Sequence, residues 1–563
     1  MRLSRTFSRR DRKDRKENRQ TLLGLCVLCV LCVSTYVTGV GTQGPAIDPQ
    51  DASFKAPPAR FADPDRRARL AKAFPEIDRM FRDYAASAHV PGAAWGIVID
   101  GELAHTGVTG YRDVPSKAPV TPDSVFRIAS MTKSFTAIAI LKLRDEGKLS
   151  LEDPVEKYVP EMKSLVYPTS DSPKITIRHL LSHAEGFPED NPWGDQQLAD
   201  SDEQLSSLIR GGIPFSNAPG VAYEYSNFGF AILGRVVGIL SGNPGTPTQA
   251  YTKYIQDNVL KPLGMTSTTL EPSTVPADRL AHGYRWEDEQ WKNEPLLANG
   301  SFGSMGGMLT TVSDLGKYVG AFLGAWPPRD GPETGPIKRS SLREMQQVWR
   351  PAAASVTGNA AGLQLNSGGY GFGLRITQNC QFPTIVAHGG GLPGFGTQMR
   401  WLPEYGVGLI AFGNRTYTGW PATFDAALAA LTATGGLQPR EIQPSLALIS
   451  ARDAVAALVV KWDDATADRI AAVNLFLDQS KDRRKAAIDA VHAQVGACTA
   501  GSGFSHVENA LRGDWMMPCA RGRAKVTITL APTMPPKVQA LTVVAVSTGA
   551  DLMPQPTCPA VVR

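Results

Sequence analysis

Apolar residues recur along this chain at two spacings, one typical of helices and one typical of strands. Five segments carry the helical spacing of three to four residues, at 65–88, 130–146, 228–240, 311–322 and 421–434. Two β-hairpins are predicted where strand-type runs flank a short turn, one around Asp100-Gly101 and one around 403–406. Residues 168–222 are rich in Pro and Gly and are predicted to be mostly loop and short helix.

The order of these elements indicates the architecture. A helix and a hairpin come first, a hairpin and a helix come last, and a mainly helical insertion separates them. Terminal helices packed on one antiparallel sheet would be the economical way to bury their apolar faces. We therefore expect a mixed α/β fold of the α+β type, in which an antiparallel sheet is flanked by terminal helices.

The pattern loosens around 435–444, where we place a domain boundary. Residues 65–435 are predicted to form one domain, and residues 41–64, rich in Pro, Ala and Asp, a linker before it. Residues 445–563 are predicted to form a smaller α+β domain of unknown role. Its expected elements are helices at 450–460 and 464–497 and strands at 525–530 and 538–547.

The first 40 residues differ from the rest in charge. Residues 1–20 hold nine Lys or Arg and three Asp or Glu, whereas residues 21–40 hold no charge. A basic start before a short apolar stretch predicts a signal peptide over 1–40 and a secreted or periplasmic protein, with an uncleaved membrane anchor as the alternative. Because this start accounts for the net charge of +5, the remainder has no general attraction for nucleic acid.

Four cysteines lie beyond the predicted signal, at 380, 498, 519 and 558. They allow three disulfide pairings after export, of which we favour Cys498–Cys519 because both lie in one short domain. The chain shows no zinc-type ligand spacing, so we expect neither a metal nor another cofactor.

The sharpest chemical pattern is Ser130-Met131-Thr132-Lys133 at the start of a predicted helix. Positions three apart share a helix face, so Lys133 can reach the Ser130 hydroxyl. Serine becomes a strong nucleophile only when a nearby base takes its proton, and lysine can be that base only if its pKa is lowered. Alone, the pattern also fits an N-cap serine followed by a solvated lysine.

Two further patterns lie downstream. Tyr225-Ser226-Asn227 precedes a predicted helix and can point a phenol and an amide into one cleft, although a packed tyrosine and an N-cap asparagine would look the same. His388-Gly389-Gly390-Gly391 precedes a predicted strand. Here His388 could bear charge or donate a hydrogen bond, and the glycines would let a substrate lie against the backbone. Gly389, Gly391 and Gly394 also match the Gly-x-Gly-x-x-Gly pattern of dinucleotide-binding sites. We reject such a site, because a strand follows the match and not a helix.

In this order, the three motifs resemble those of the serine β-lactamase-related family over residues 65–435. That family includes class C β-lactamases, D-alanyl-D-alanine carboxypeptidases, D-aminopeptidases and family VIII-type esterases. The surrounding residues strengthen the likeness, among them Phe126-Arg127-Ile128-Ala129 before the serine and the stretch from Ile177 to His183. The resemblance implies a β-lactamase/transpeptidase-like fold.

The resemblance also implies roles. Ser130 would form an acyl-enzyme, Lys133 and Tyr225 would share the proton transfers, and Asn227 would orient the substrate. Backbone N–H groups of Ser130 and Gly391 would form the oxyanion hole, with His388 and Gly390 beside the substrate. Histidine stands where β-lactamases usually have lysine, which favours esterase or peptidase activity over strong β-lactamase activity.

The expected function is therefore a secreted serine hydrolase that cleaves an ester or amide. The substrate would be a small molecule or peptide, such as a small ester, a D-amino-acid peptide, a β-lactam-like compound or a peptidoglycan-derived fragment. The alternative is a catalytically idle relative that acts as a cell-envelope binding or assembly protein. Any membrane contact would come only through an uncleaved signal. His179 and His183 are expected to be structural.

Overall fold

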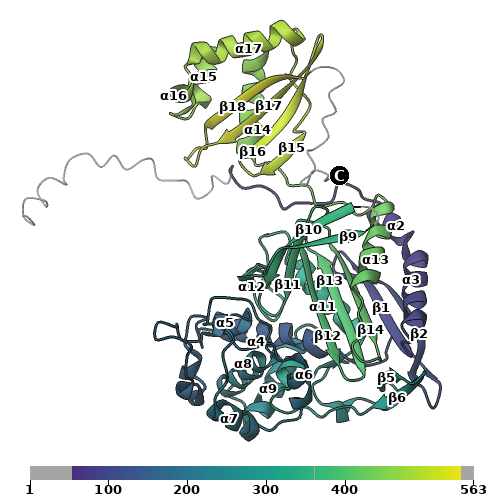
Figure 1. Ribbon diagram of the computed structural model, residues 1–563. Coiled ribbons are helices and arrows are strands. Elements are labelled where there is room, and N and C mark those ends of the chain that lie inside the picture. The colour runs from purple at the N-terminus through teal and green to yellow at the C-terminus, as the bar shows by residue number, and fades with distance from the viewer. Residues whose placement is uncertain (1–52, 360–361, 547–563) are drawn as a thin grey trace, which may run out of the picture. The chain divides into compact units, whose positions relative to one another are not determined.

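The computed structural model describes residues 53–359 and 362–546 (Figure 1). The described chain divides into two compact units: the larger is Pro57–Gln443, and the smaller is Pro444–Val546 together with the described residues up to Ala56. The predicted signal peptide at 1–40, part of the predicted linker and Cys558 lie outside the described residues.

The larger unit is built on a ten-stranded sheet in which every pairing is antiparallel. Its strands run, in spatial order, as β3 (Ala118–Pro119), β2 (Glu102–Asp113), β1 (Gly92–Ile99), β14 (Val407–Gly413), β13 (Phe395–Leu402), β12 (Ile385–Leu392), β11 (Arg375–Asn379), β10 (Gly362–Tyr370) and β8 (Arg350–Pro351), with β9 (Ser355–Asn359) also paired to β10. The first long strand therefore lies beside the last.

Both predicted hairpins are present. The turn between β1 and β2 has positive φ at both central residues, +55° at Asp100 and +88° at Gly101. This conformation suits an Asp-Gly pair, and its twist matches that of the flanking strands. The second hairpin joins β13 to β14, with Leu402 paired to Val407.

The terminal helices pack on the sheet as expected. These are α2 (Arg66–Ala71), α3 (Phe74–Ser87) and α13 (Pro421–Ala433). They share one apolar core with β1 and β14, in which Phe81 of α3 stacks on Trp95 of the sheet and on Trp420. The single helix expected over 65–88 is wrong in detail, because Pro75 in the first turn of α3 begins a new helix.

The insertion is helical and forms the second large core with the other face of the sheet. Figure 1 shows its helices gathered beside the sheet: α4 (Thr132–Asp145), α5 (Ile177–Leu181), α6 (Asn191–Gly194), α7 (Asp202–Gly211), α8 (Asn227–Leu240) and α9 (Pro247–Ile255). Helix α11 (Val312–Gly324), which comes later in the sequence, contacts β1 and β14. Helix α4 is buried on nearly all sides, so its polar side chains need partners inside the protein.

The smaller unit combines four helices with a four-stranded sheet. The helices are α14 (Leu446–Val460), α15 (Asp464–Ile470), α16 (Leu475–Asp478) and α17 (Lys481–Val495), and the strands are β15 (His506–Asn509), β16 (Arg512–Cys519), β17 (Gly522–Leu530) and β18 (Val538–Val546), paired in that order. Alternate residues of β17 are buried, as in a sheet covered on one face. The predicted Cys498–Cys519 disulfide is confirmed.

Two expectations for the smaller unit need correction. The helix expected over 464–497 is three helices, and strands β15 and β16 were not predicted. Among the described residues of the whole chain, no helix has the length and apolar character needed to cross a bilayer.

Candidate active site

Ser130 lies in a short 3-10 turn, Ala129–Met131, which leads directly into α4. The residue before it, Ala129, has φ of +48°, in the left-handed region that residues with a Cβ atom rarely adopt. Backbone of this kind costs free energy and persists only where the surrounding structure holds it. The turn leaves Ser130 8% exposed, at the surface of a cleft.

Lys133 is fully buried beneath Ser130. Its ammonium nitrogen donates to Ser130 Oγ at 3.1 Å, to Asn227 Oδ1 at 2.6 Å and to the Met305 carbonyl at 2.9 Å. The alternative interpretation of a solvated lysine is therefore wrong. Burial lowers the pKa of Lys133 to about 7, although the carboxylates of Asp195 and Asp190 oppose the shift. Near neutral pH a large fraction of Lys133 is uncharged and able to accept a proton.

Tyr225 packs close to this lysine. Its ring centroid is 4.9 Å from Lys133 Nζ. Burial raises the pKa of the phenol well above its usual range, and a hydrogen bond with the Ser130 side chain opposes this shift only in part. The phenol is therefore protonated at neutral pH. His183 packs 4.3 Å from the Tyr225 ring and accepts the Ser226 N–H through Nδ1, which fits the structural role expected for it.

Asn227 is buried at the start of α8, and its side chain is engaged on both sides. Its Oδ1 accepts from Lys133, and its Nδ2 donates to Asn191 Oδ1 at 3.1 Å. The interpretation of Asn227 as an N-cap is wrong, because the Ser226 hydroxyl caps α8 by accepting the Gly229 N–H. The structure places Asn227 against the lysine, and its contact with a substrate stays a prediction.

His388 lies within strand β12 itself, which the sequence did not predict. Its Nδ1 donates to the Gly389 carbonyl at 2.6 Å, so its Nε2 accepts from the Tyr370 hydroxyl at 2.8 Å. Burial lowers the pKa of His388 to about 3, and the nearby Arg375 and Lys133 charges add to the shift. The expectation that His388 could bear a charge is therefore corrected: its imidazole is neutral, and protein atoms occupy both ring nitrogens.

The glycine after His388 and Gly389 brings β12 against the serine turn. A Cβ atom on Gly390 would lie 2.1 Å from the Ile128 carbonyl oxygen. The same carbonyl accepts the Thr397 hydroxyl from the neighbouring strand at 3.0 Å. Only glycine permits this approach, and it places the next residue, Gly391, in the wall of the same cleft as Ser130.

The cleft has a volume of about 470 Å³. It brings together five of the seven residues expected from sequence, Ser130, Tyr225, His388, Gly390 and Gly391. Lys133 and Asn227 lie behind its wall and are joined to it by hydrogen bonds. Sequence reasoning missed seven polar side chains of the cleft, Asn191, Asp195, Arg375, Thr397, Gln398, Tyr417 and Thr418.

Arg375 is the cation of this cleft. It begins β11 and pairs in register with Ala387, next to His388. Its guanidinium carbon lies 5.6 Å from the Tyr225 ring centroid, and the residue is exposed to solvent. Nothing in the spacing of the motifs marks Arg375, because only the register of two unpredicted strands brings it to the site.

Asp195 and Tyr417 form a pair across the cleft. The Tyr417 hydroxyl donates to Asp195 Oδ2 at 2.6 Å, although 222 residues separate the two in the chain. Tyr417 adopts φ of +50°, a costly conformation for a tyrosine. Burial raises the pKa of Asp195 to about 6.

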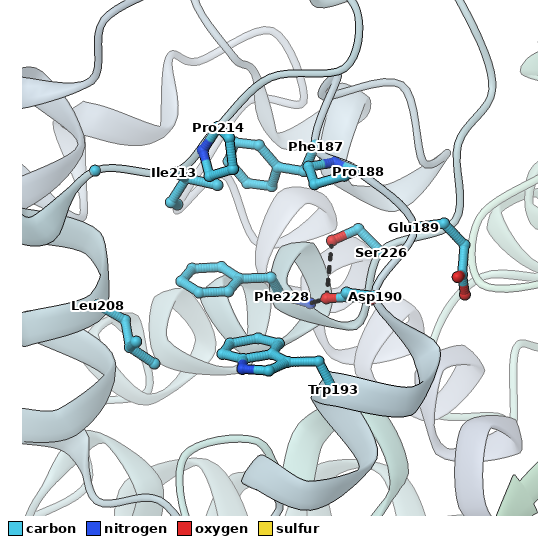
Figure 2. Close-up of a pocket in the computed structure, with 11 residues that line it drawn as sticks. Phe187, Pro188, Glu189, Asp190, Trp193, Leu208, Ile213, Pro214, Ser226 and Phe228 are labelled. Carbon is cyan, nitrogen blue, oxygen red and sulfur yellow. Dashed lines mark hydrogen bonds between the residues drawn. The ribbon is translucent and has the colours of Figure 1, made fainter.

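A second cavity, of about 310 Å³, is lined by residues between positions 187 and 228. Figure 2 shows the apolar side chains around it, with Phe187 and Pro214 on one side and Phe228 and Trp193 on the other. At its polar end the Asp190 carboxylate accepts the backbone N–H groups of Asn227 at 2.7 Å and Phe228 at 2.9 Å. Asp190 therefore fixes the N-terminus of α8, where Asn227 meets Lys133.

Comparisons with known proteins show which proteins this chain resembles. A family model described as Beta-lactamase matches residues 77–434. The chain is 28% identical over 345 residues to Protein flp of Staphylococcus aureus (strain N315), covering 60% of this chain and 62% of the relative. It is 25% identical over 337 residues to penicillin-binding protein 4* of Bacillus subtilis (strain 168), covering 56% of this chain and 66% of that relative. The chain thus spans less than two thirds of the length of these relatives.

A solved structure of an octameric penicillin-binding protein homologue from Pyrococcus abyssi is similar in fold. Its TM-score is 0.54 at 23% identity, over 81% of this chain and 90% of the other. This likeness confirms the expected β-lactamase/transpeptidase-like fold. Since the family model covers well over half of the residues and includes all three motifs, the chain belongs to the Beta-lactamase family.

Proposed function

We propose that this protein is a serine hydrolase that cleaves an ester or amide through an acyl-enzyme on Ser130. One observation carries the proposal: a fully buried lysine, with its pKa lowered to about 7, donates to Ser130 Oγ at 3.1 Å. A lysine desolvated in this way is a general base matched to neutral pH. Tyr225 keeps its proton in the same range, so Lys133 is the better candidate for the base.

The proposed reaction has two halves. Uncharged Lys133 accepts the Ser130 proton, directly or through the Tyr225 hydroxyl, as Oγ bonds to the substrate carbonyl carbon. The backbone N–H groups of Ser130 and Gly391 stabilise the resulting oxyanion. The tetrahedral intermediate then collapses, and the leaving group takes the proton from Lys133 or Tyr225. Water attacks the acyl ester by the same proton path and frees Ser130.

The charges of the cleft support a substrate with a carboxylate. His388 is neutral, with both ring nitrogens occupied, but Arg375 lines the same cleft and pairs with the neighbouring Ala387. Arginine binds carboxylates with two parallel hydrogen bonds. Candidate substrates are D-amino-acid peptides, β-lactam-like compounds and peptidoglycan-derived fragments, and small esters would be accepted without using this contact.

We also propose that the protein is exported. The support is the basic and then apolar N-terminal sequence, together with the Cys498–Cys519 disulfide. Disulfides persist in oxidising compartments such as the periplasm and the cell exterior.

The second candidate function is an idle binding or assembly protein of the cell envelope. The burial and hydrogen bonds of Lys133 favour the enzyme, because a buried lysine is costly and a non-catalytic protein would have no need of it.

A fluorophosphonate probe tests the choice. We expect the probe to add covalently to Ser130 of the wild type, with the site identified by mass spectrometry, and to spare Ser130→Ala. Ser164→Ala, at an exposed serine outside the cleft, is the matched control and should label as the wild type does. A folded wild type that does not label would support the idle protein.

A further inference from the structure

The cleft carries opposite charges at two points along strand β12. Arg375 pairs with Ala387 of that strand. At the other point, Tyr417 lies against Gly391, where an added Cβ atom would come within 2.4 Å of Tyr417 Cδ1, and Tyr417 in turn donates to Asp195. Ala387 and Gly391 are four residues apart, which corresponds to about 13 Å along an extended strand. His388, Gly389 and Gly390 of β12 lie between them.

Asp195 is only 2% exposed, yet it lines the cleft. Its Oδ2 accepts the Tyr417 hydroxyl, and among the described residues Oδ1 has no hydrogen-bond partner. Lys133, whose charge acts on Asp195, donates instead to Ser130, Asn227 and Met305. A buried carboxylate normally has its oxygens paired, so Asp195 keeps an acceptor for a ligand.

We propose that Asp195 binds the ammonium group of a substrate whose acyl part carries a free amine. This inference rests on the proposed function and names the substrate class of the same cleft: short, unblocked, zwitterionic compounds such as dipeptides and tripeptides. Their amine meets Asp195 and their carboxylate meets Arg375.

The chemistry of the two ends supports this choice. An ionised carboxylate only accepts hydrogen bonds, and a charged donor pairs with it more strongly than a neutral one. An extended dipeptide spans about 7 Å and a tripeptide about 10 Å, so both fit within the length of about 13 Å between the two points of the strand. An acetylated amine loses both the charge and two of its donors.

The test measures binding and does not depend on turnover. In the full chain carrying Ser130→Ala, calorimetry would compare D-alanyl-D-alanine with N-acetyl-D-alanyl-D-alanine. We expect the free amine to bind at least about tenfold more tightly, a typical effect of losing one charge-assisted contact. Adding Asp195→Asn, which keeps the side-chain volume, should remove most of this preference. Tyr417→Phe, which removes the hydrogen bond to Asp195 and leaves the carboxylate, should retain it.

The outcomes are distinct. Equal affinity for the two dipeptides, no binding of either, or a preference that survives Asp195→Asn would overturn the ammonium site. Should Asp195→Asn fail to fold, Asp195→Ser replaces it. Labelling of Ser130 by the fluorophosphonate probe in the wild type tests the proposed function separately, so a reactive serine with no amine preference would refute this inference alone.

Discussion

Asn227 Oδ1 lies 2.6 Å from Lys133 Nζ, closer than Ser130 Oγ at 3.1 Å. The amide is itself held by Asn191 through Nδ2. Asn227 therefore helps to orient the lysine toward the serine. The position of the proposed base depends on a side chain that does not line the cleft.

Replacing Asn227 by Ala should weaken both activity and stability. The change leaves a donor of buried Lys133 without an acceptor, which costs about 1–3 kcal/mol of the free energy of unfolding. We expect kcat/KM for a small ester to fall by at least about a hundredfold, because a misplaced base loses most of a general-base contribution. Urea unfolding and steady-state kinetics measure the two effects. Asn227→Asp is the control: it keeps an acceptor, so the loss of stability should be smaller.

The pH dependence of the wild type should follow Lys133. Burial lowers its pKa to about 7, and only the uncharged amine accepts the serine proton. In the free enzyme kcat/KM should therefore rise with pH through about 7 and then level off. Asp195 raises the pKa of Lys133, so Asp195→Asn should move the rise to lower pH. A profile that is flat from pH 5 to 9 would argue against Lys133 as the base.

Ser130→Ala should abolish turnover and leave the fold intact. The hydroxyl is one of three acceptors of buried Lys133, so its loss should lower the free energy of unfolding by at most about 1–3 kcal/mol and leave the chain folded. Loss of an activated nucleophile typically costs several orders of magnitude in rate. Residual activity above about 1% of the wild type, with circular dichroism unchanged, would mean that another group attacks the substrate.

Charge in the cleft should decide between carboxylate-bearing and neutral substrates. Arg375→Gln should lower kcat/KM for a carboxylate-bearing β-lactam at least about tenfold relative to a short p-nitrophenyl ester, because it removes a charged contact. His388→Lys should shift the same ratio the other way, by adding a fixed positive charge. If His388→Lys leaves the ratio unmoved, position 388 does not face the substrate carboxylate.

The disulfide should stabilise the smaller unit without affecting catalysis. Cys498 and Cys519 are 21 residues apart, and closing a loop of this size contributes about 3 kcal/mol. Every described residue that lines the cleft belongs to Pro57–Gln443. Replacing both cysteines by serine should thus lower the unfolding midpoint of the smaller unit while small-ester hydrolysis is retained. Mass mapping without reductant would check the pairing, and free thiols at both positions would contradict it.

Local patterns of sequence were enough to predict part of this protein. Helical spacing identified α4 and α8, and the Asp-Gly turn identified the hairpin of β1 and β2. The contact of Ser130 with Lys133 follows from one helical turn. Each of these features depends on residues close together in the chain.

The remaining features depend on packing between distant segments. Strand β12 contains three consecutive glycines, which have low strand propensity, so its pairing is set by its neighbours. Arg375 reaches the cleft only through the register of β11 on β12, and Asp195 meets Tyr417 across 222 residues. No local spacing records such contacts.

The pairing of β1 with β14 has a consequence for how the protein is made. Ala93 pairs with Gly413 and Ile99 with Val407, so the central sheet cannot close until the ribosome has passed residue 413. Contacts of such long sequence separation form slowly, because a large loop must first be ordered. The nascent chain should accordingly lack a closed central sheet for most of its synthesis, a state that would suit the export that we propose.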